Sequence, residues 1–325
     1  MRTRYGMIAL ALASLFPLAS SFAADTKLVK AVSDHFELYT TDNDAAAKAA
    51  LQHFETVRGY LLKTLHSQDP FTAPVRIVGF KSLGEYTPYI PRTGDLASKA
   101  FTESKGDSVT LVMSSLKKEA YQFGVREYAM LLLDKVAPKM PYWLKMGMSE
   151  LYSTLYEDNG LMRLGAEPAR DFRATVSPDF DMAVMFALKG GVSRNKGAAD
   201  FYSESTAANV TKTGSTMANM EATTTVDYPV VLWQLTHMLM FKNEYRPKFG
   251  AFVNAVGAEN TDAVVGQVYG QSLAGLKQDL VLYIKLPSHA VAGIKFDLDT
   301  PVTPQVSQLN AAESALVLAD LKAAK

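Results

Sequence analysis

The sequence contains no cysteine and carries no net charge. Its 325 residues include 33 basic and 33 acidic side chains, so the formal net charge at pH 7 is zero. A chain without cysteine can form no disulfide, and its stability has to come from a packed core. A balanced charge gives no sign of the basic surface that proteins use to bind nucleic acid. We therefore expect a globular protein that has no nucleic-acid partner.

Long apolar runs are also missing after the first two dozen residues. No later stretch contains 18 consecutive apolar residues, the length that marks a candidate membrane-spanning helix. The start of the chain differs, because Arg2 and Arg4 precede an apolar run over residues 7–18. Ser21 and Ala23 then place small residues before a cleavage site, which is the pattern of a secretory signal.

The same start has a second interpretation as a membrane anchor, but the run is short for a membrane span. We expect residues 1–23 to be removed as a signal peptide. The mature protein should then have no transmembrane segment and should be periplasmic or extracellular.

Hydrophobic periodicity predicts an α+β fold. Residues 24–115 mix strand and helix patterns, residues 116–290 are mainly helical, and residues 291–325 form a C-terminal extension with a terminal helix. The expected strands cover residues 28–32, 36–39, 74–80, 100–103, 109–113 and 296–298. The expected helices cover residues 44–66, 82–89, 118–136, 141–156, 180–188, 229–241, 246–256, 261–269, 273–284 and 310–323.

Turn and cap residues set several boundaries. Asn159 and Gly160 are expected to stop the helix over residues 141–156. Asn310 and Glu313 have the spacing of a capping pair for the last helix. Residues 191–227 are rich in Ser, Thr, Ala, Asn and Gly, and this composition predicts a mobile surface loop.

Two consecutive expected helices carry the informative residues, VREYAM at 125–130 and PYWLKMGMSELY at 141–152. Their order resembles the gluzincin zinc peptidases, and within them the peptidase MA-like family of exported bacterial proteins of unknown function. That family carries a His-Glu-x-x-His helix, followed by a P-x-W-L-x-E-G-x-A-E helix whose first Glu is the third zinc ligand. HFELYT at 35–40, PVRIVGF at 74–80 and WQLTHMLMF at 233–241 extend the resemblance. It implies a small strand-rich N-terminal part packed on a mainly helical, thermolysin-like part.

The zinc-ligand positions implied by the resemblance hold Arg126, Met130 and Met146. Arginine stays protonated and has no lone pair to give, and the thioether of methionine suits Cu(I) rather than zinc. Only Glu127, the family's general base, and Glu150 match the pattern. Because a catalytic zinc site takes three protein ligands and a water, we expect no zinc, no other cofactor and an idle Glu127.

Several of these side chains have alternative interpretations. Arg126 either fills the former metal position, paired with Glu150 or otherwise Glu127, or binds an anionic ligand in the cleft. The methionines at 130, 140, 146 and 148 are interpreted as core fillers, with a copper site as the alternative. Glu150, Trp143 and His237 are candidates for the cleft or the shell behind it. Most aromatic side chains around the two helices, Trp143 among them, are nevertheless expected in the core, and His237 lies among apolar residues and favours a core histidine.

We therefore expect an exported metallopeptidase-like protein that is not an enzyme. Such a pseudopeptidase can keep its cleft as a module for binding a peptide or a cell-envelope protein. One alternative is an active peptidase with a non-standard metal site, and another is a purely structural or assembly protein with a closed cleft. Resemblance of fold cannot choose among them, because function depends on the site.

Overall fold

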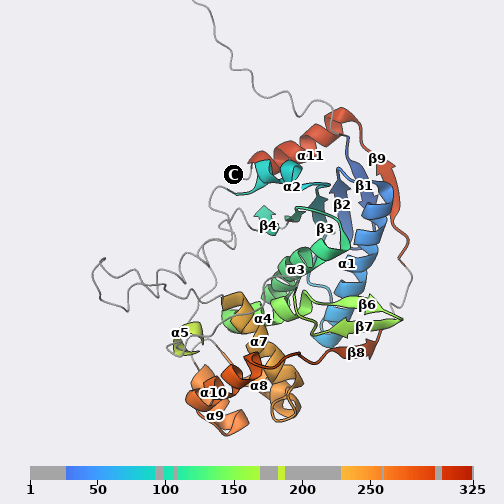
Figure 1. Ribbon diagram of the computed structural model, residues 1–325. Helices are drawn as coiled ribbons and strands as arrows, with labels where there is room; N and C mark the ends of the chain where they lie inside the picture. The colour runs from blue at the N-terminus through green and yellow to red at the C-terminus, as the bar shows by residue number, and fades with distance from the viewer. Residues whose placement is uncertain are drawn as a thin grey trace, which may run out of the picture.

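The computed structural model describes residues 27–91, 99–105, 108–168, 182–186, 228–257, 260–296 and 302–323. Helices and a mixed sheet together make an α+β fold, as the periodicity predicted (Figure 1). The expected signal at residues 1–23 and the expected loop at residues 191–227 lie outside the described ranges. Within those ranges, every helix is too short or too polar to cross a membrane.

A six-stranded sheet forms one half of the molecule, in the order β4-β5-β3-β2-β1-β9. Its central strands β2, β3 and β5 are parallel, and β1, β9 and β4 pair antiparallel at the sides. The strands are β1 Val29–Val32, β2 Phe36–Thr40, β3 Val75–Gly79, β4 Ala100–Lys105, β5 Ser108–Met113 and β9 Gln305–Gln308. The central strands read as apolar runs in the sequence because the sheet is covered on both faces.

Helices cover each face of this sheet. On one face, α1 (Asp44–Thr64) and α3 (Tyr121–Val136) pack into the main apolar core. On the other face, α2 (Leu83–Tyr86) and α11 (Ala311–Ala323) enclose a smaller core (Figure 1). Helix α11 begins with the expected capping pair, since Asn310 Oδ1 accepts from Glu313 N at 3.0 Å and Glu313 Oε2 accepts from Asn310 N at 2.9 Å.

The other half of the molecule is helical. Helix α4 (Tyr142–Tyr152) lies between α3 and α7 (Tyr228–Phe241) (Figure 1). The remaining helices are α5 Met182–Phe186, α8 Phe249–Ala255, α9 Thr261–Tyr269 and α10 Leu273–Ile284. Short 3-10 turns at Thr87–Tyr89, Lys118–Ala120 and Arg246–Lys248 join or precede helices. The two motif helices α3 and α4 therefore lie side by side at the centre of the fold.

The predicted helix over residues 141–156 is too long. Helix α4 ends at Tyr152, and a hairpin of β6 (Tyr156–Asp158) and β7 (Leu161–Leu164) follows. Asn159 and Gly160 have φ of 52° and 72°, so they form the hairpin turn rather than a helix stop. An Asn-Gly pair favours this two-residue turn because both central residues need a positive φ.

The predicted strand over residues 296–298 lies mostly outside the described ranges. The strand β8 is Ala292–Lys295, and it pairs with β7 to complete a three-stranded sheet. Phe296 follows the strand, and residues 297–298 lie outside the described ranges. Strand β9 was not predicted, because its sequence QVSQ has no apolar pattern and its place is decided by pairing with β1. The C-terminal extension thus joins both sheets.

Gly147 sets the close approach of α4 to α7. A Cβ atom at this position would lie 2.1 Å from Oγ1 of Thr236 and 2.7 Å from the carbonyl oxygen of Leu232. The Leu232 oxygen belongs to the backbone of α7, so a side chain at residue 147 forces the two helices apart.

Exchange of Gly147 for alanine should therefore lower the free energy of unfolding by about 1–3 kcal/mol, although alanine has the higher helix propensity. Urea unfolding followed by circular dichroism measures the change. Gly250 in α8 is the matched control, because a Cβ atom there meets nothing within 4 Å. Gly250→Ala should be neutral or stabilising, and an equal loss in both variants would contradict the role given to Gly147.

Candidate functional site

Arg126 and Glu127 on α3 meet Glu150 on α4. The guanidinium of Arg126 donates to Oε1 of Glu127 from Nη2 at 2.7 Å and from Nε at 3.2 Å. Its Nη1 lies 3.5 Å from Oε1 of Glu150. The prediction that Arg126 pairs with a carboxylate is confirmed, but the shorter contact is to Glu127 and not to Glu150. These three residues are called the charge cluster below.

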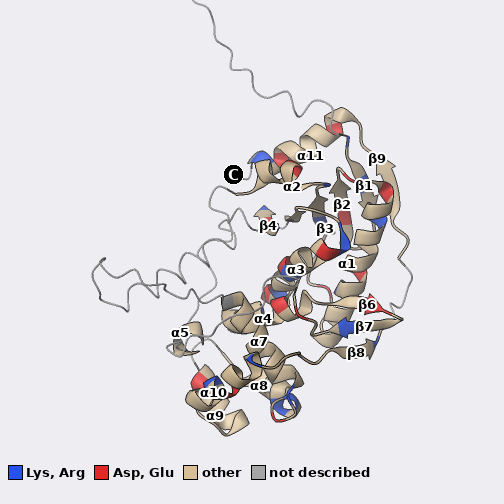
Figure 2. Ribbon diagram, viewed as in Figure 1, with Lys and Arg blue, Asp and Glu red and all other residues tan. Residues whose placement is uncertain are grey.

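The charge cluster is mostly shielded from water. The side chains of Arg126 and Glu127 are 14% and 18% exposed, and that of Glu150 is 3% exposed. A buried carboxylate without a partner is costly, so the guanidinium stabilises Glu150 across the interface of α3 and α4. Basic and acidic residues adjoin along α3 in Figure 2. The cluster therefore ties the two motif helices together by charge.

The other two positions at which the resemblance implies zinc ligands lie near this cluster in the sequence, and their methionine side chains are mainly apolar. Met130 is half-buried, and Met146 is half-buried and packs against the main core. Met140 and Met148 are core residues. This is the environment expected of methionine as an adaptable filler. Among the described residues, no group of three or more His, Asp or Glu side chains is placed to hold a metal ion.

Trp143 belongs to the core and not to a cleft wall. Its side chain is fully buried, with ring centroids 4.6 Å from Phe186 and 6.3 Å from Phe252. Its Nε1 donates to Oγ1 of Thr261 at 3.4 Å. The core expectation for Trp143 is thus confirmed over the alternative that it lines a cleft, because α4 turns this face toward α5 and α8.

His237 is a satisfied core histidine, as its apolar neighbours in the sequence predicted. Its Nε2 lies 2.9 Å from the carbonyl oxygen of Ala290 and 3.0 Å from that of Gly165. Carbonyl oxygens only accept, so Nε2 carries the proton and Nδ1 accepts from the hydroxyl of Tyr283 at 2.7 Å. Burial, and to a smaller extent His289, lowers the pKa of His237 to about 4.

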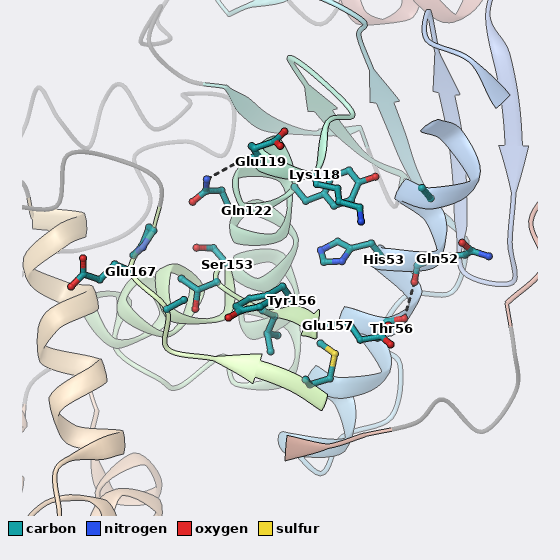
Figure 3. A pocket seen from close by; sticks show the side chains of 17 residues that line it. Gln52, His53, Thr56, Lys118, Glu119, Gln122, Ser153, Tyr156, Glu157 and Glu167 are labelled. Carbon is teal, nitrogen blue, oxygen red and sulfur yellow. Dashed lines mark hydrogen bonds between the residues drawn. The ribbon is translucent and has the colours of Figure 1, made fainter. Parts of the chain in front are cut away.

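A cavity of about 580 Å³ opens beside the motif helices (Figure 3). One wall is a single face of α1 with Gln52, His53 and Thr56. The start of α3 and the 3-10 turn before it supply a second wall, and the segment from the end of α4 to residue 168, just beyond β7, supplies a third. We call this space the His53 cavity. Sequence reasoning missed it, because its walls come from segments that are far apart in the chain.

The His53 cavity lies about one helical turn from the charge cluster. Gln122 lines the cavity from α3 four residues before Arg126, and Ser153 lines it three residues after Glu150. The hydroxyl of Ser153 donates to the carbonyl oxygen of Glu150 at 2.6 Å. The arrangement places an open, partly polar space at the end of the two helices that carry the motif residues.

The ring of His53 points into this cavity (Figure 3). It stacks on Tyr121 with ring centroids 4.7 Å apart, and its buried Nε2 has no hydrogen-bond partner among the described residues. Burial, with a smaller contribution from the Lys118 ammonium, lowers the pKa of His53 to about 4. The imidazole is therefore neutral near pH 7 and can accept a hydrogen bond.

Comparison of the chain with models of known protein families, with curated proteins and with solved structures found no match.

Exchange of Arg126 for methionine should destabilise the protein by about 3–5 kcal/mol, because it leaves the buried carboxylate of Glu150 without the guanidinium. Urea unfolding at neutral pH measures the loss. The matched control is Arg163→Met, which removes an ion pair with Asp158 whose side chains are 29% and 44% exposed. That change should cost about 0–1 kcal/mol. Adding Glu150→Leu to Arg126→Met should recover stability. If Arg126→Met and Arg163→Met lowered the free energy of unfolding equally, the role given to the charge cluster would be contradicted.

The stability of the protein should fall as the pH drops from about 6.5 toward 4, partly through His237. As the pH falls below the ordinary pKa of 6.5, His237 becomes protonated in the unfolded chain. In the folded chain it stays neutral down to about pH 4, so the unfolded state is favoured in between. The full difference corresponds to about 3 kcal/mol.

The pH dependence is measured by urea unfolding at about pH 7 and about pH 4.5, because most of the predicted loss of stability falls between these two values. His237→Gln should show a smaller loss between the two than the unmodified protein, with the remaining loss coming in part from His53. His66→Asn is the control at an exposed position whose φ of 50° asparagine adopts readily. An unchanged pH dependence in His237→Gln would show that this histidine is not held neutral.

Proposed function

We propose that this chain is an exported, non-catalytic relative of the gluzincin zinc peptidases that binds a peptide or protein segment in the His53 cavity. The observation that carries the proposal is the charge cluster. The guanidinium of Arg126, at the position of the family's first zinc ligand, holds Glu127 and Glu150. An open cavity lies about one helical turn away.

The loss of catalysis follows from the chemistry of the cluster. A zinc-dependent peptidase needs a metal-bound water and a carboxylate that takes its proton. Here the carboxylate of Glu127 is held by Arg126 at 2.7 Å. A fixed positive charge at this place repels a divalent cation and offers it no lone pair. The side chains at 130 and 146 supply only thioethers, which are poor ligands for zinc.

The binding role rests on the cavity. Its volume of about 580 Å³ lies within the range of roughly 300–1,000 Å³ that ligand sites occupy. Its lining combines aromatic rings with amide, hydroxyl and carboxylate groups, which is the mixed lining of a specific site. The signal-like residues 1–23 place the proposed ligand among peptides or proteins of the cell envelope or the surrounding medium.

A second candidate is a purely structural protein. The shielded Arg126–Glu150 contact favours it, because a clamp between α3 and α4 is itself a reason to keep these residues. In that case the His53 cavity binds nothing. The peptide-binding measurements below separate the two candidates.

The purified protein should contain no stoichiometric zinc and should cleave no peptide in a metal-dependent way. Elemental analysis, together with a cleavage assay with and without a chelator, measures both. About one zinc per chain with chelator-sensitive cleavage would overturn the proposal and would favour an active peptidase with a non-standard site.

Restoring the family pattern should restore metal binding. Arg126→His, Met130→His and Met146→Glu together should give a protein that binds about one zinc per chain, because two histidines four apart share a helix face. The matched control keeps Arg126 and changes only Met130 and Met146, and it should bind no zinc, since the guanidinium remains. A well-folded triple variant without zinc would count against the resemblance.

A further inference from the structure

The charged side chains that line the His53 cavity are mostly acidic. Among the described residues, Glu119, Glu157 and Glu167 line it together with a single basic residue, Lys118. His53 adds no charge near pH 7, because its pKa is about 4. The described part of the lining therefore has an excess of negative charge in a protein whose overall charge is balanced.

Two of these carboxylates have no ion-pair partner within the described part of the chain. Glu119 lies in the 3-10 turn before α3, and Glu157 lies in β6. Both are exposed, and neither approaches a Lys, Arg or His side chain of the described residues within the range of an ion pair. Glu167, beyond β7, accepts from Nδ1 of His289 at 2.9 Å through one oxygen. The labelled carboxylates surround the cavity in Figure 3.

The neutral hydroxyl groups of the lining are already used within their own segments. Thr56 donates to the carbonyl oxygen of Gln52 at 2.9 Å, and Thr154 donates to that of Leu151 at 2.7 Å. Ser153 donates to Glu150, as described above. The hydrogens of these three hydroxyl groups are thus already donated within the protein, whereas the carboxylates of the lining are acceptors for a ligand.

Aromatic and imidazole groups in the lining also favour a positively charged ligand. Tyr156 is 43% exposed on β6, whereas Tyr121 is 6% exposed and its ring is stacked on that of His53. The face of a tyrosine ring attracts ammonium and guanidinium groups. The unpartnered Nε2 of His53 belongs to a neutral ring, which offers a lone pair to an N–H donor. The carboxylates, the exposed ring of Tyr156 and a neutral imidazole together favour a ligand that carries positive charge.

We propose that the His53 cavity binds the side chain of a lysine or arginine residue within a peptide, held by Glu119 and Glu157. The inference rests on the proposed function and names the ligand class of that site. In Figure 3, Lys118 lies near His53, Glu119 lies near Gln122 and Glu157 lies beside Thr56, so the two carboxylates face the space from different walls. Salt should weaken binding, because the two carboxylates are exposed and screened.

The test uses the mature chain and a series of blocked ten-residue peptides that differ only at one central position. Titration calorimetry compares Arg, Lys, Gln and Glu at that position. The Arg and Lys peptides should bind roughly 10-fold more tightly than the Gln peptide, and the Glu peptide more weakly still.

The double variant Glu119→Gln/Glu157→Gln should lose this preference while it keeps the affinity for the Gln peptide. Both glutamates are exposed, so the thermal unfolding of the variant should be unchanged. Glu244→Gln is the matched control, because Glu244 is 68% exposed and does not line the cavity. Gln52→Trp should block binding of every peptide, whereas Lys48→Trp, one turn earlier on α1 and outside the lining, should not.

The outcomes separate the two proposals. Binding of all four peptides with equal affinity, or a preference that survives in the double variant, overturns the cationic ligand and leaves peptide binding in place. Binding of no peptide overturns the proposed function and the inference with it. Spermidine tests whether the positive charge in the cavity comes from a free organic cation. Tighter binding of spermidine than of the Arg peptide would overturn the assignment to a peptide side chain.

Discussion

The buried carboxylate of Glu150 is the constraint on which the centre of this fold depends. It lies at the interface of α3 and α4, where an unbalanced negative charge would be costly. The guanidinium of Arg126 approaches it from the neighbouring helix and also holds Glu127. Three residues before Glu150 on α4, Gly147 allows α7 to pack closely. The position of α4 is thus set by charge against α3 and by steric fit against α7.

A guanidinium can hold this geometry without supplying peptidase chemistry. Zinc would polarise a carbonyl group and lower the pKa of a bound water, which are the two contributions that peptide hydrolysis needs. Arginine supplies positive charge and five N–H donors in a fixed plane, but no coordination site and no exchangeable water. An arginine at 126 is therefore compatible with a packed helix pair and an adjoining cavity, and it is incompatible with the mechanism of the family that the sequence resembles.

The C-terminal segment makes the two halves of the protein depend on each other. Strand β8 extends the small sheet after β7, and β9 then pairs with β1 at the edge of the large sheet. Helix α11 follows and covers the outer face, where Ser314 accepts from the backbone N–H of Leu28 at 3.0 Å and Asp320 pairs with Arg76 at 3.0 Å. The first and last described segments are therefore neighbours. Strands β8 and β9 connect the small sheet, which carries one wall of the His53 cavity, to the large sheet.

The sequence alone determined the class of fold, most helix positions and the chemistry of the charge cluster. The helices at Thr261–Tyr269 and Leu273–Ile284 have their predicted bounds, and a carboxylate partner for Arg126 followed from the cost of burying its charge. Tertiary structure decided which carboxylate lies closest, where β9 pairs and that the His53 cavity exists. Local patterns fix backbone conformation and the buried face of each element, whereas these features depend on contacts between segments far apart in the chain.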